Sequence, residues 1–108
     1  MIVNNKLKKR MNKTEEMFSW ILESEKRDGK IKYWGFEVIK LRIGNNCVYN
    51  IDFMVVDKND RLILKEVKGG RIWEDSVIKF KAACEMYPFI QFEMHQYKNK
   101  QWKMIRNN

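Results

Sequence analysis

The sequence predicts an α/β fold in which helices flank a mixed central β-sheet. Two segments carry apolar residues at helical spacing, and the segments between and after them have the apolar patterns of strands. The order is helix, three strands, helix, two strands (α-β-β-β-α-β-β), which suits one sheet covered by helices. A chain of 108 residues, 44% of them hydrophobic, is long enough for one such core and too short for two.

The first helix is expected to begin after Asn12 and to end near Asp28-Gly29. Asn12 is followed three residues later by Glu15, which is the pattern of a capping box. Gly29 would supply the turn at the carboxyl end. One broad apolar stripe at helical spacing contains Met17, Phe18, Trp20, Ile21 and Leu22.

Three strands are expected between the helices, at residues 33–43, 47–56 and 61–68. All three are rich in Val, Ile, Leu and aromatic residues. Two clusters of turn-forming residues, 44–46 and 57–60, separate them. The second and third strands are therefore expected to form a hairpin.

The second helix is expected from Glu74 to Met86, and Pro88 ends it. Two last strands, about 89–97 and 101–105, flank a short polar turn. The residues of this helix expected to be buried are Val77, Ile78, Phe80, Ala83, Cys84 and Tyr87.

The net charge is +8, from 22 Lys and Arg against 14 Asp and Glu. Residues 6–13 and residues 98–106 hold several cations and no acid. Residues 1–11 are expected to form a flexible basic arm before a single domain, residues 12–108. Basic ends on a compact domain suit a polyanion such as nucleic acid. The alternative is a solubilising charge without a specific partner.

Several classes of protein have no support in the sequence. No apolar run approaches the roughly 18 residues of a membrane-spanning helix. The first residues lack the order of a secretory signal, so a cytoplasmic location is expected. Cys47 and Cys84 are too far apart for a zinc motif and form no disulfide framework. No phosphate-binding glycine loop and no Ser/His/Asp arrangement is visible.

Asp52 and Glu66 interrupt strongly apolar strands, where an unpaired carboxylate is costly. A three-residue loop at 58–60 would place Asp52 opposite Glu66, with Cβ atoms about 4.5–5.5 Å apart. Lys68 would project from the same face because side chains alternate along a strand. Two carboxylates this close repel each other unless a cation lies between them. The alternative is a cross-strand acid–lysine pair on a solvated face.

A hard divalent cation fits this pair of acids. Mg²⁺ prefers oxygen ligands, and the carbonyl of Val67 is a further candidate ligand between the two side chains. The bound ion would activate water, and Lys68 would orient that water or offset charge in the transition state. Either Glu15 or Glu16, from the first helix, would complete the site.

These residues resemble the PD-(D/E)xK nuclease superfamily, in which an Asp on one strand precedes an E-x-K motif on the next. More narrowly, parts of the chain resemble small phage-encoded nucleases akin to the endonuclease I type of Holliday-junction resolvase. The similar segments are residues 12–15, 49–53, 66–69 and 79–89. The resemblance implies a restriction-endonuclease-like fold, metal ligands at Asp52 and Glu66, a catalytic Lys68 and a helix carboxylate at Glu15. One departure is Ile51, where the superfamily usually has Pro.

The resemblance implies a Mg²⁺-dependent endonuclease, with Mn²⁺ as a possible substitute, that cuts branched or structured DNA in a phage-infected bacterial host. A homodimer is possible, since two symmetric sites would cut both strands. The alternative is a basic domain that binds nucleic acid without cutting it. The residues expected to contact DNA are Lys13, Arg71, Lys79 and Lys81.

Overall fold

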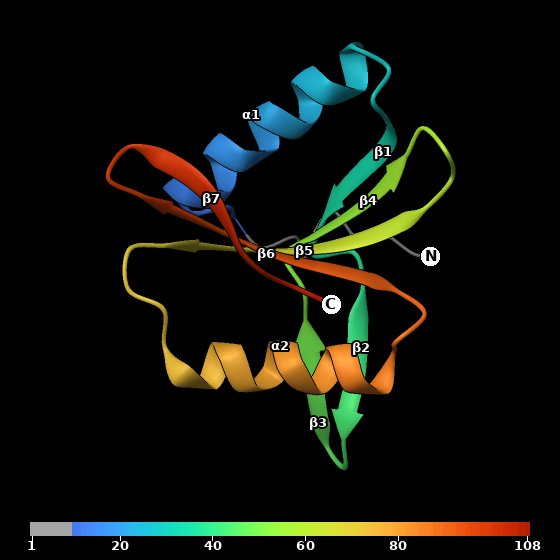
Figure 1. Cartoon of the computed structure of the whole chain (residues 1–108), viewed down its shortest axis with the longest axis vertical. Helices are drawn as coiled ribbons and strands as arrows, with labels where there is room; N and C mark the ends of the chain where they lie inside the picture. Colours follow the sequence, from blue (N-terminus) through green and yellow to red (C-terminus); the bar gives the residue numbers. More distant parts are fainter. Residues whose placement is uncertain (1–9) are drawn as a thin grey trace.

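The computed structural model describes residues 10–108 and shows an α/β domain with a mixed five-stranded sheet between two helices (Figure 1). In Figure 1 the helix α1 covers one face of the sheet and the helix α2 covers the other. The expected arm, residues 1–11, lies mostly outside the described residues. Its last residue, Met11, packs against the core cluster beneath α1.

The first helix, α1 (Lys13–Arg27), begins and ends where the sequence predicts. Asn12 and Glu15 form the expected capping box, and Asp28 is the last cap residue. The predicted apolar stripe is wrong at Trp20, which is 62% exposed, and at Ile21, which is also exposed. The buried face is set by Phe18 and Leu22, and Trp20 lies about 200° around the helix from Phe18.

The two strands predicted at 33–43 and 47–56 are each broken in the middle, so the expected order of three strands before α2 is wrong. The structure has five strands there, and the two broken segments supply four of them, as two antiparallel pairs. One pair, β1 (Ile31–Phe36) and β4 (Phe53–Asp57), belongs to the five-stranded sheet. The other pair, beside α2, consists of β2 (Lys40–Gly44) and β3 (Cys47–Asn50). The chain bends at Glu37, whose φ of 50° is left-handed, and at Ile51-Asp52.

The central strand β5 (Leu62–Gly69) pairs antiparallel with β4, in the register that the sequence predicts. Phe53 faces Lys65, so the next position out places Asp52 opposite Glu66. On its other side β5 pairs with β6 (Gln91–Lys98), which is the only parallel pairing among the described strands. The last strand, β7 (Gln101–Asn107), completes the sheet order β1-β4-β5-β6-β7.

The second helix, α2 (Glu74–Met86), has the predicted bounds. Phe80 and Ala83 are its buried residues, as expected. Ile78 is 57% exposed, so its predicted burial is wrong. It precedes Phe80 by two positions and therefore lies on the opposite side of the helix.

Two core clusters lie on the two faces of the sheet, and the side-chain alternation of β5 connects them. Ile63 and Val67 pack beneath α1, whereas Leu64 packs beneath α2 with Phe80 and Met54. Glu66 shares the α2 side with Leu64 because it is two residues further along the strand. Within the described residues, no helix is long and apolar enough to cross a membrane.

Candidate metal and active site

Asp52 lies in the bend between β3 and β4, just before the paired part of the sheet begins. Its side chain is buried, with 7% of the residue exposed. The backbone N–H of Val67 donates a 2.8 Å hydrogen bond to Oδ2 of Asp52. The carboxylate of Asp52 therefore accepts the hydrogen bond that a backbone carbonyl of β4 would accept if the pairing with β5 continued.

Glu66 is on β5 and is 4% exposed. Its Oε1 accepts a 2.9 Å hydrogen bond from the hydroxyl of Tyr49, and its Oε2 lies 2.8 Å from Nζ of Lys68. The sequence predicts that Glu66 and Lys68 lie close together. It does not predict the role of Tyr49, which comes from β3 and is buried in the cluster beneath α2.

Glu15 is the carboxylate that α1 brings to this end of the sheet. It is buried, whereas Glu16 is exposed, so the choice between the two adjacent acids falls on Glu15. Its Oε1 accepts a hydrogen bond from the backbone N–H of Asn12, and the capping box therefore fixes its orientation.

Glu37 is a fourth carboxylate at this end of the sheet, and no pattern in the sequence predicts it there. One carboxylate oxygen from each of Glu15, Glu37 and Asp52 lies within 4.8 Å of the others. The backbone N–H of Glu37 donates a 2.7 Å hydrogen bond to the carbonyl of Asp52, so the bend in the hairpin places these two residues side by side. Oε1 of Glu37 also accepts a hydrogen bond from Asn50.

The buried position of Asp52, close to another carboxylate, raises its pKa to about 8. Burial is the largest cause, and the negative charge of Glu66 is the next. The hydrogen bond from Val67 and the charge of Lys68 oppose this rise only in part. The site therefore favours a bound cation or proton near Asp52.

Two groups that contact Glu66, Lys68 and Tyr49, also have shifted pKa values. Burial lowers the pKa of Lys68, but the Glu66 carboxylate raises it and the net change is upward, so the amine stays charged. Burial and the charge of Glu66 both raise the pKa of the Tyr49 hydroxyl, which stays protonated. Each group therefore donates a hydrogen bond to Glu66.

The predicted DNA-contacting residues are all exposed, and they lie on different elements. Lys13 is the first residue of α1, and the guanidinium of Arg71 lies over the ring of Trp73 in the loop after β5. Lys79 and Lys81 are on α2. In the described part of the chain, no hydrogen bond or ion pair joins either lysine to the carboxylates.

Comparisons with protein-family models, with curated proteins and with solved structures find no match to this chain.

Proposed function

We propose that this domain is a metal-dependent DNA endonuclease of the PD-(D/E)xK type, with a restriction-endonuclease-like arrangement of its sheet and helices. The observation that carries the proposal is the meeting of buried Asp52 and Glu66 at one end of the sheet with Nζ of Lys68, 2.8 Å from Glu66. A solvated surface pair is a poor explanation because both acids are almost completely buried.

The donor set fits a hard cation. Glu15, Glu37 and Asp52 each place one carboxylate oxygen within 4.8 Å of the others, and Glu66, whose charge acts on Asp52, would supply a further oxygen. The N–H of Val67 points to the Asp52 side of β5. In an extended strand the carbonyl of the same residue points the same way, so Val67 offers a further oxygen there. Mg²⁺ is the expected ion, and Mn²⁺ is a suitable substitute.

A metal held by these oxygens would lower the pKa of a coordinated water and offset the charge that builds on a phosphodiester. Lys68, which stays protonated beside Glu66, would orient the attacking water or donate to a phosphate oxygen. Tyr49 and the backbone of Val67 hold the two carboxylates in place.

The proposed substrate is DNA, and branched or otherwise structured DNA is the preferred form. Net charge supports a polyanionic substrate, and Lys13, Arg71, Lys79 and Lys81 are exposed and available to phosphates. The resemblance to phage nucleases supports a reaction in the cytoplasm of a bacterial host. A homodimer would present two such sites to the two strands of a duplex or junction.

A cleavage assay tests this proposal. Supercoiled, linear, single-stranded and four-way-junction DNA are incubated with the full chain in Mg²⁺ or in EDTA. Cleavage is expected in Mg²⁺ alone, and Asp52→Asn, Glu66→Gln and Lys68→Ala are each expected to reduce its rate at least about 100-fold while DNA binding remains.

Lys65→Ala is the matched control for Lys68→Ala. Lys65 is on the same strand and pairs with a carboxylate, that of Glu93, at 3.4 Å, but it lies on the opposite face of β5. Cleavage should survive in this variant. Full cleavage by all three site variants would refute the nuclease. Salt-sensitive binding without cleavage of any substrate would show instead a non-catalytic nucleic-acid-binding domain.

A further inference from the structure

The parallel pairing of β5 and β6 brings two basic loops to one edge of the sheet. Gly69 pairs with Tyr97, so the segments that follow them, Gly70–Trp73 and Lys98–Lys100, begin side by side. In open α/β sheets, ligands bind outside the carboxyl ends of the strands. Lys68 of the proposed active site is at this end of β5, two residues before Gly70.

The first loop is fixed at its base and exposed at its tip. The backbone N–H of Gly70 donates to the carbonyl of Tyr97 at 3.1 Å, and the Gln96 side chain donates to the carbonyl of Gly70. The φ of Gly70 is 65°, which turns the chain away from the sheet. Trp73 then projects into solvent, 62% exposed.

Arg71 covers one side of this indole, with its guanidinium carbon 4.3 Å from the ring centroid. The exposure that remains belongs to the other face and the rim of the ring. A large aromatic side chain held in this way has an open face on which another flat group can stack.

The second loop carries cations in a backbone conformation that favours glycine. Asn99 and Lys100 connect β6 to β7, and their φ values are 54° and 60°. Such two-residue turns usually have Asn followed by Gly, because a side chain at positive φ is strained. The sequence therefore keeps a lysine at the tip of the turn at a conformational cost.

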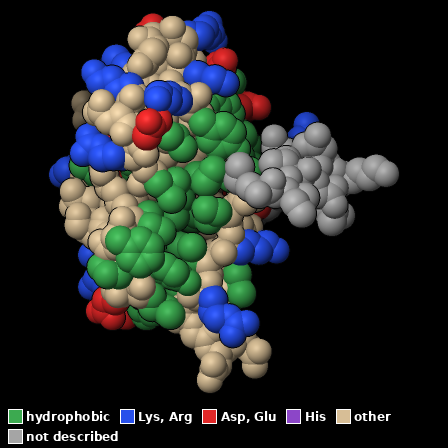
Figure 2. Space-filling model, turned by 90° about the vertical axis from the view of Figure 1, so that its right-hand side faces the viewer, with side chains coloured by type: hydrophobic (Ala, Val, Ile, Leu, Met, Phe, Trp, Pro, Cys, Tyr) green, Lys and Arg blue, Asp and Glu red, His purple; other side chains and the backbone are tan. Residues whose placement is uncertain are grey.

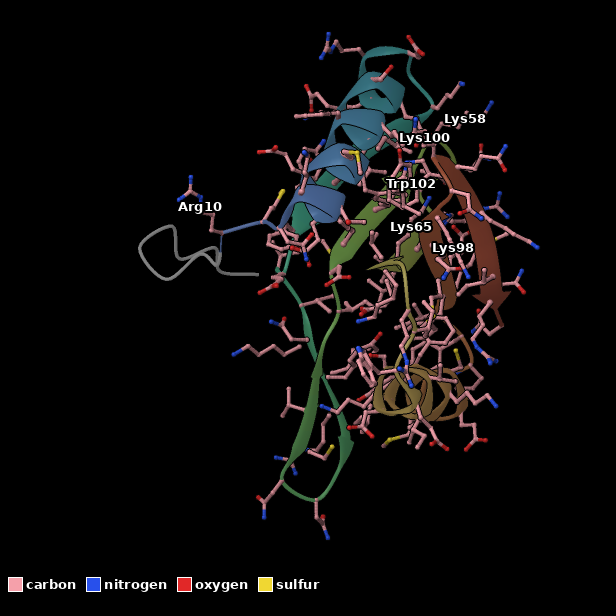
Figure 3. The ribbon with its side chains drawn as sticks, turned by 90° about the vertical axis from the view of Figure 1, so that its left-hand side faces the viewer. Arg10, Lys58, Lys65, Lys98, Lys100 and Trp102 are labelled. Carbon is pink, nitrogen blue, oxygen red and sulfur yellow. The ribbon has the colours of Figure 1, made fainter. Side chains whose placement is uncertain are left out.

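The distribution of charge singles out the same edge. The face in Figure 2 has a broad hydrophobic area over its middle. Figure 3 shows the opposite side, where Lys98 and Lys100, at the turn between β6 and β7, lie near Trp102 of β7. Glu74 and Asp75 follow Trp73 in the first turn of α2 and would repel phosphates. A polyanion on Trp73 would therefore extend toward the β6–β7 turn.

We infer that Arg71, Trp73, Lys98 and Lys100 form a binding surface for an unpaired DNA strand, with a base stacked on Trp73 and phosphates beside the three cations. An unpaired strand is favoured over a duplex because its bases have free faces to stack. The inference builds on the proposed function, since it places a single-stranded segment beside the phosphodiester that the nuclease cuts.

Tryptophan fluorescence in EDTA tests the surface without any cleavage. The probes are a twelve-residue oligothymidylate and a twelve-base-pair duplex. We expect the single strand to quench the fluorescence and to bind more tightly than the duplex. Trp73→Ala should abolish most of the quenching and weaken binding about 5- to 100-fold. Trp20→Ala is the matched control, since Trp20 is also 62% exposed but lies on α1. Equal affinities in the two variants, or tighter binding of the duplex, would overturn the inference.

Lys100→Gly separates a binding role from a structural one. Glycine relieves the backbone strain, so the melting temperature should stay the same or rise. Affinity for the single strand should nevertheless fall several-fold, and the dependence of log affinity on log salt should become shallower by about 0.7. Unchanged affinity and an unchanged salt slope would argue against this surface.

A cleavage arm distinguishes this inference from the nuclease proposal. Asp52→Asn should bind the oligothymidylate like the unaltered protein. If the protein binds the single strand through Trp73 but cuts nothing in Mg²⁺, the binding surface is supported and the nuclease proposal is refuted. If cleavage of flapped DNA requires Asp52 but is unaffected by Trp73→Ala, the nuclease proposal is supported and the binding surface is refuted.

Discussion

The backbone N–H of Val67 donates a 2.8 Å hydrogen bond to Oδ2 of Asp52, fifteen residues earlier in the chain. This bond fixes one oxygen of a buried acid on the strand that carries Glu66 and Lys68. The position has a cost, because burial and the charge of Glu66 raise the pKa of Asp52 to about 8. The protein thus holds a carboxylate where ionisation is unfavourable without a cation.

The first prediction concerns the pH dependence of stability in the metal-free protein. The ordinary pKa of Asp is 3.8, so between about pH 4 and pH 8 the folded state binds a proton that the unfolded state has released. The free energy of unfolding therefore falls as the pH rises through this range. In Asp52→Asn this contribution is absent. In thermal melts in EDTA, the melting temperature of the variant relative to that of the unaltered protein should rise from pH 5 to pH 8. The difference should change by at least about 4 °C by pH 8.

Asp57→Asn is the control, because the carboxylate of Asp57 should contribute to stability with the opposite dependence on pH. The backbone N–H of Arg61, among other donors, lowers the pKa of Asp57, so its charged form stabilises the fold above its ordinary pKa and this contribution is lost in acid. The Asp57 variant should therefore melt below the unaltered protein at pH 7. If the Asp52→Asn and unaltered curves run parallel from pH 5 to pH 8, the burial of an ionisable Asp52 is incorrect.

The second prediction is that Tyr49 positions Glu66. Tyr49→Phe removes the hydroxyl that donates to Oε1 of Glu66 and leaves the ring in the core. We expect cleavage to fall about 10- to 100-fold and the Mg²⁺ concentration for half-maximal rate to rise, because the supporting bond to a ligand is lost. Stability should fall by about 1–2 kcal/mol.

Tyr87→Phe is the control for this loss of a hydroxyl. The Tyr87 hydroxyl donates to the backbone carbonyl of Arg42 at 2.7 Å and touches none of the proposed ligands. Its removal should leave the Mg²⁺ titration unchanged. The positioning role fails if the two variants shift the Mg²⁺ titration equally.

The third prediction separates the two adjacent acids of α1. Glu15→Gln removes a buried carboxylate within 4.8 Å of oxygens of Asp52 and Glu37, whereas Glu16→Gln changes an exposed side chain. Cleavage should fall at least about 10-fold in the first variant and stay unchanged in the second. Glutamine retains an oxygen for the capping bond to Asn12, so both variants should fold. Equal rates in the two variants would remove Glu15 from the site.

The hairpin of β4 and β5 could be predicted from the sequence because a short polar turn fixes its register. That register is enough to bring Asp52, Glu66 and Lys68 together. The helices were also predictable, since a capping box and Pro88 define their ends. The burial of individual residues such as Trp20 could not be predicted as well, because packing decides which part of the broad apolar stripe of α1 faces the sheet.

Glu37 could not be predicted because the register of the first hairpin shifts along its length. The pairing of Gly44 with Cys47, continued without irregularity, would place Ile39 opposite Asp52. Irregular pairing near Arg42 and the bend after Phe36 move the register by two positions. The left-handed φ of Glu37 belongs to this bend, and neither Glu37 nor its neighbours Phe36 and Val38 are glycine or proline.

The fourth prediction concerns the contact that docks α1 beside β5. Gly69 closes β5, and a Cβ added to it would lie 2.7 Å from Oγ1 of Thr14. Gly69→Ala should therefore push α1 away and lower stability by about 1–3 kcal/mol. It should also slow cleavage, because Glu15 follows Thr14. The double variant with Thr14→Ala should recover most of both losses, as seen by thermal melts and cleavage rates.

Gly70→Ala tests whether this recovery is specific. Gly70 has a φ of 65° and no atom within 4 Å of an added Cβ, so its alanine variant is strained in the backbone and does not press on Thr14. Thr14→Ala should therefore not rescue it. Rescue of both glycine variants by Thr14→Ala, or of neither, would show that close approach at Gly69 does not set the position of α1.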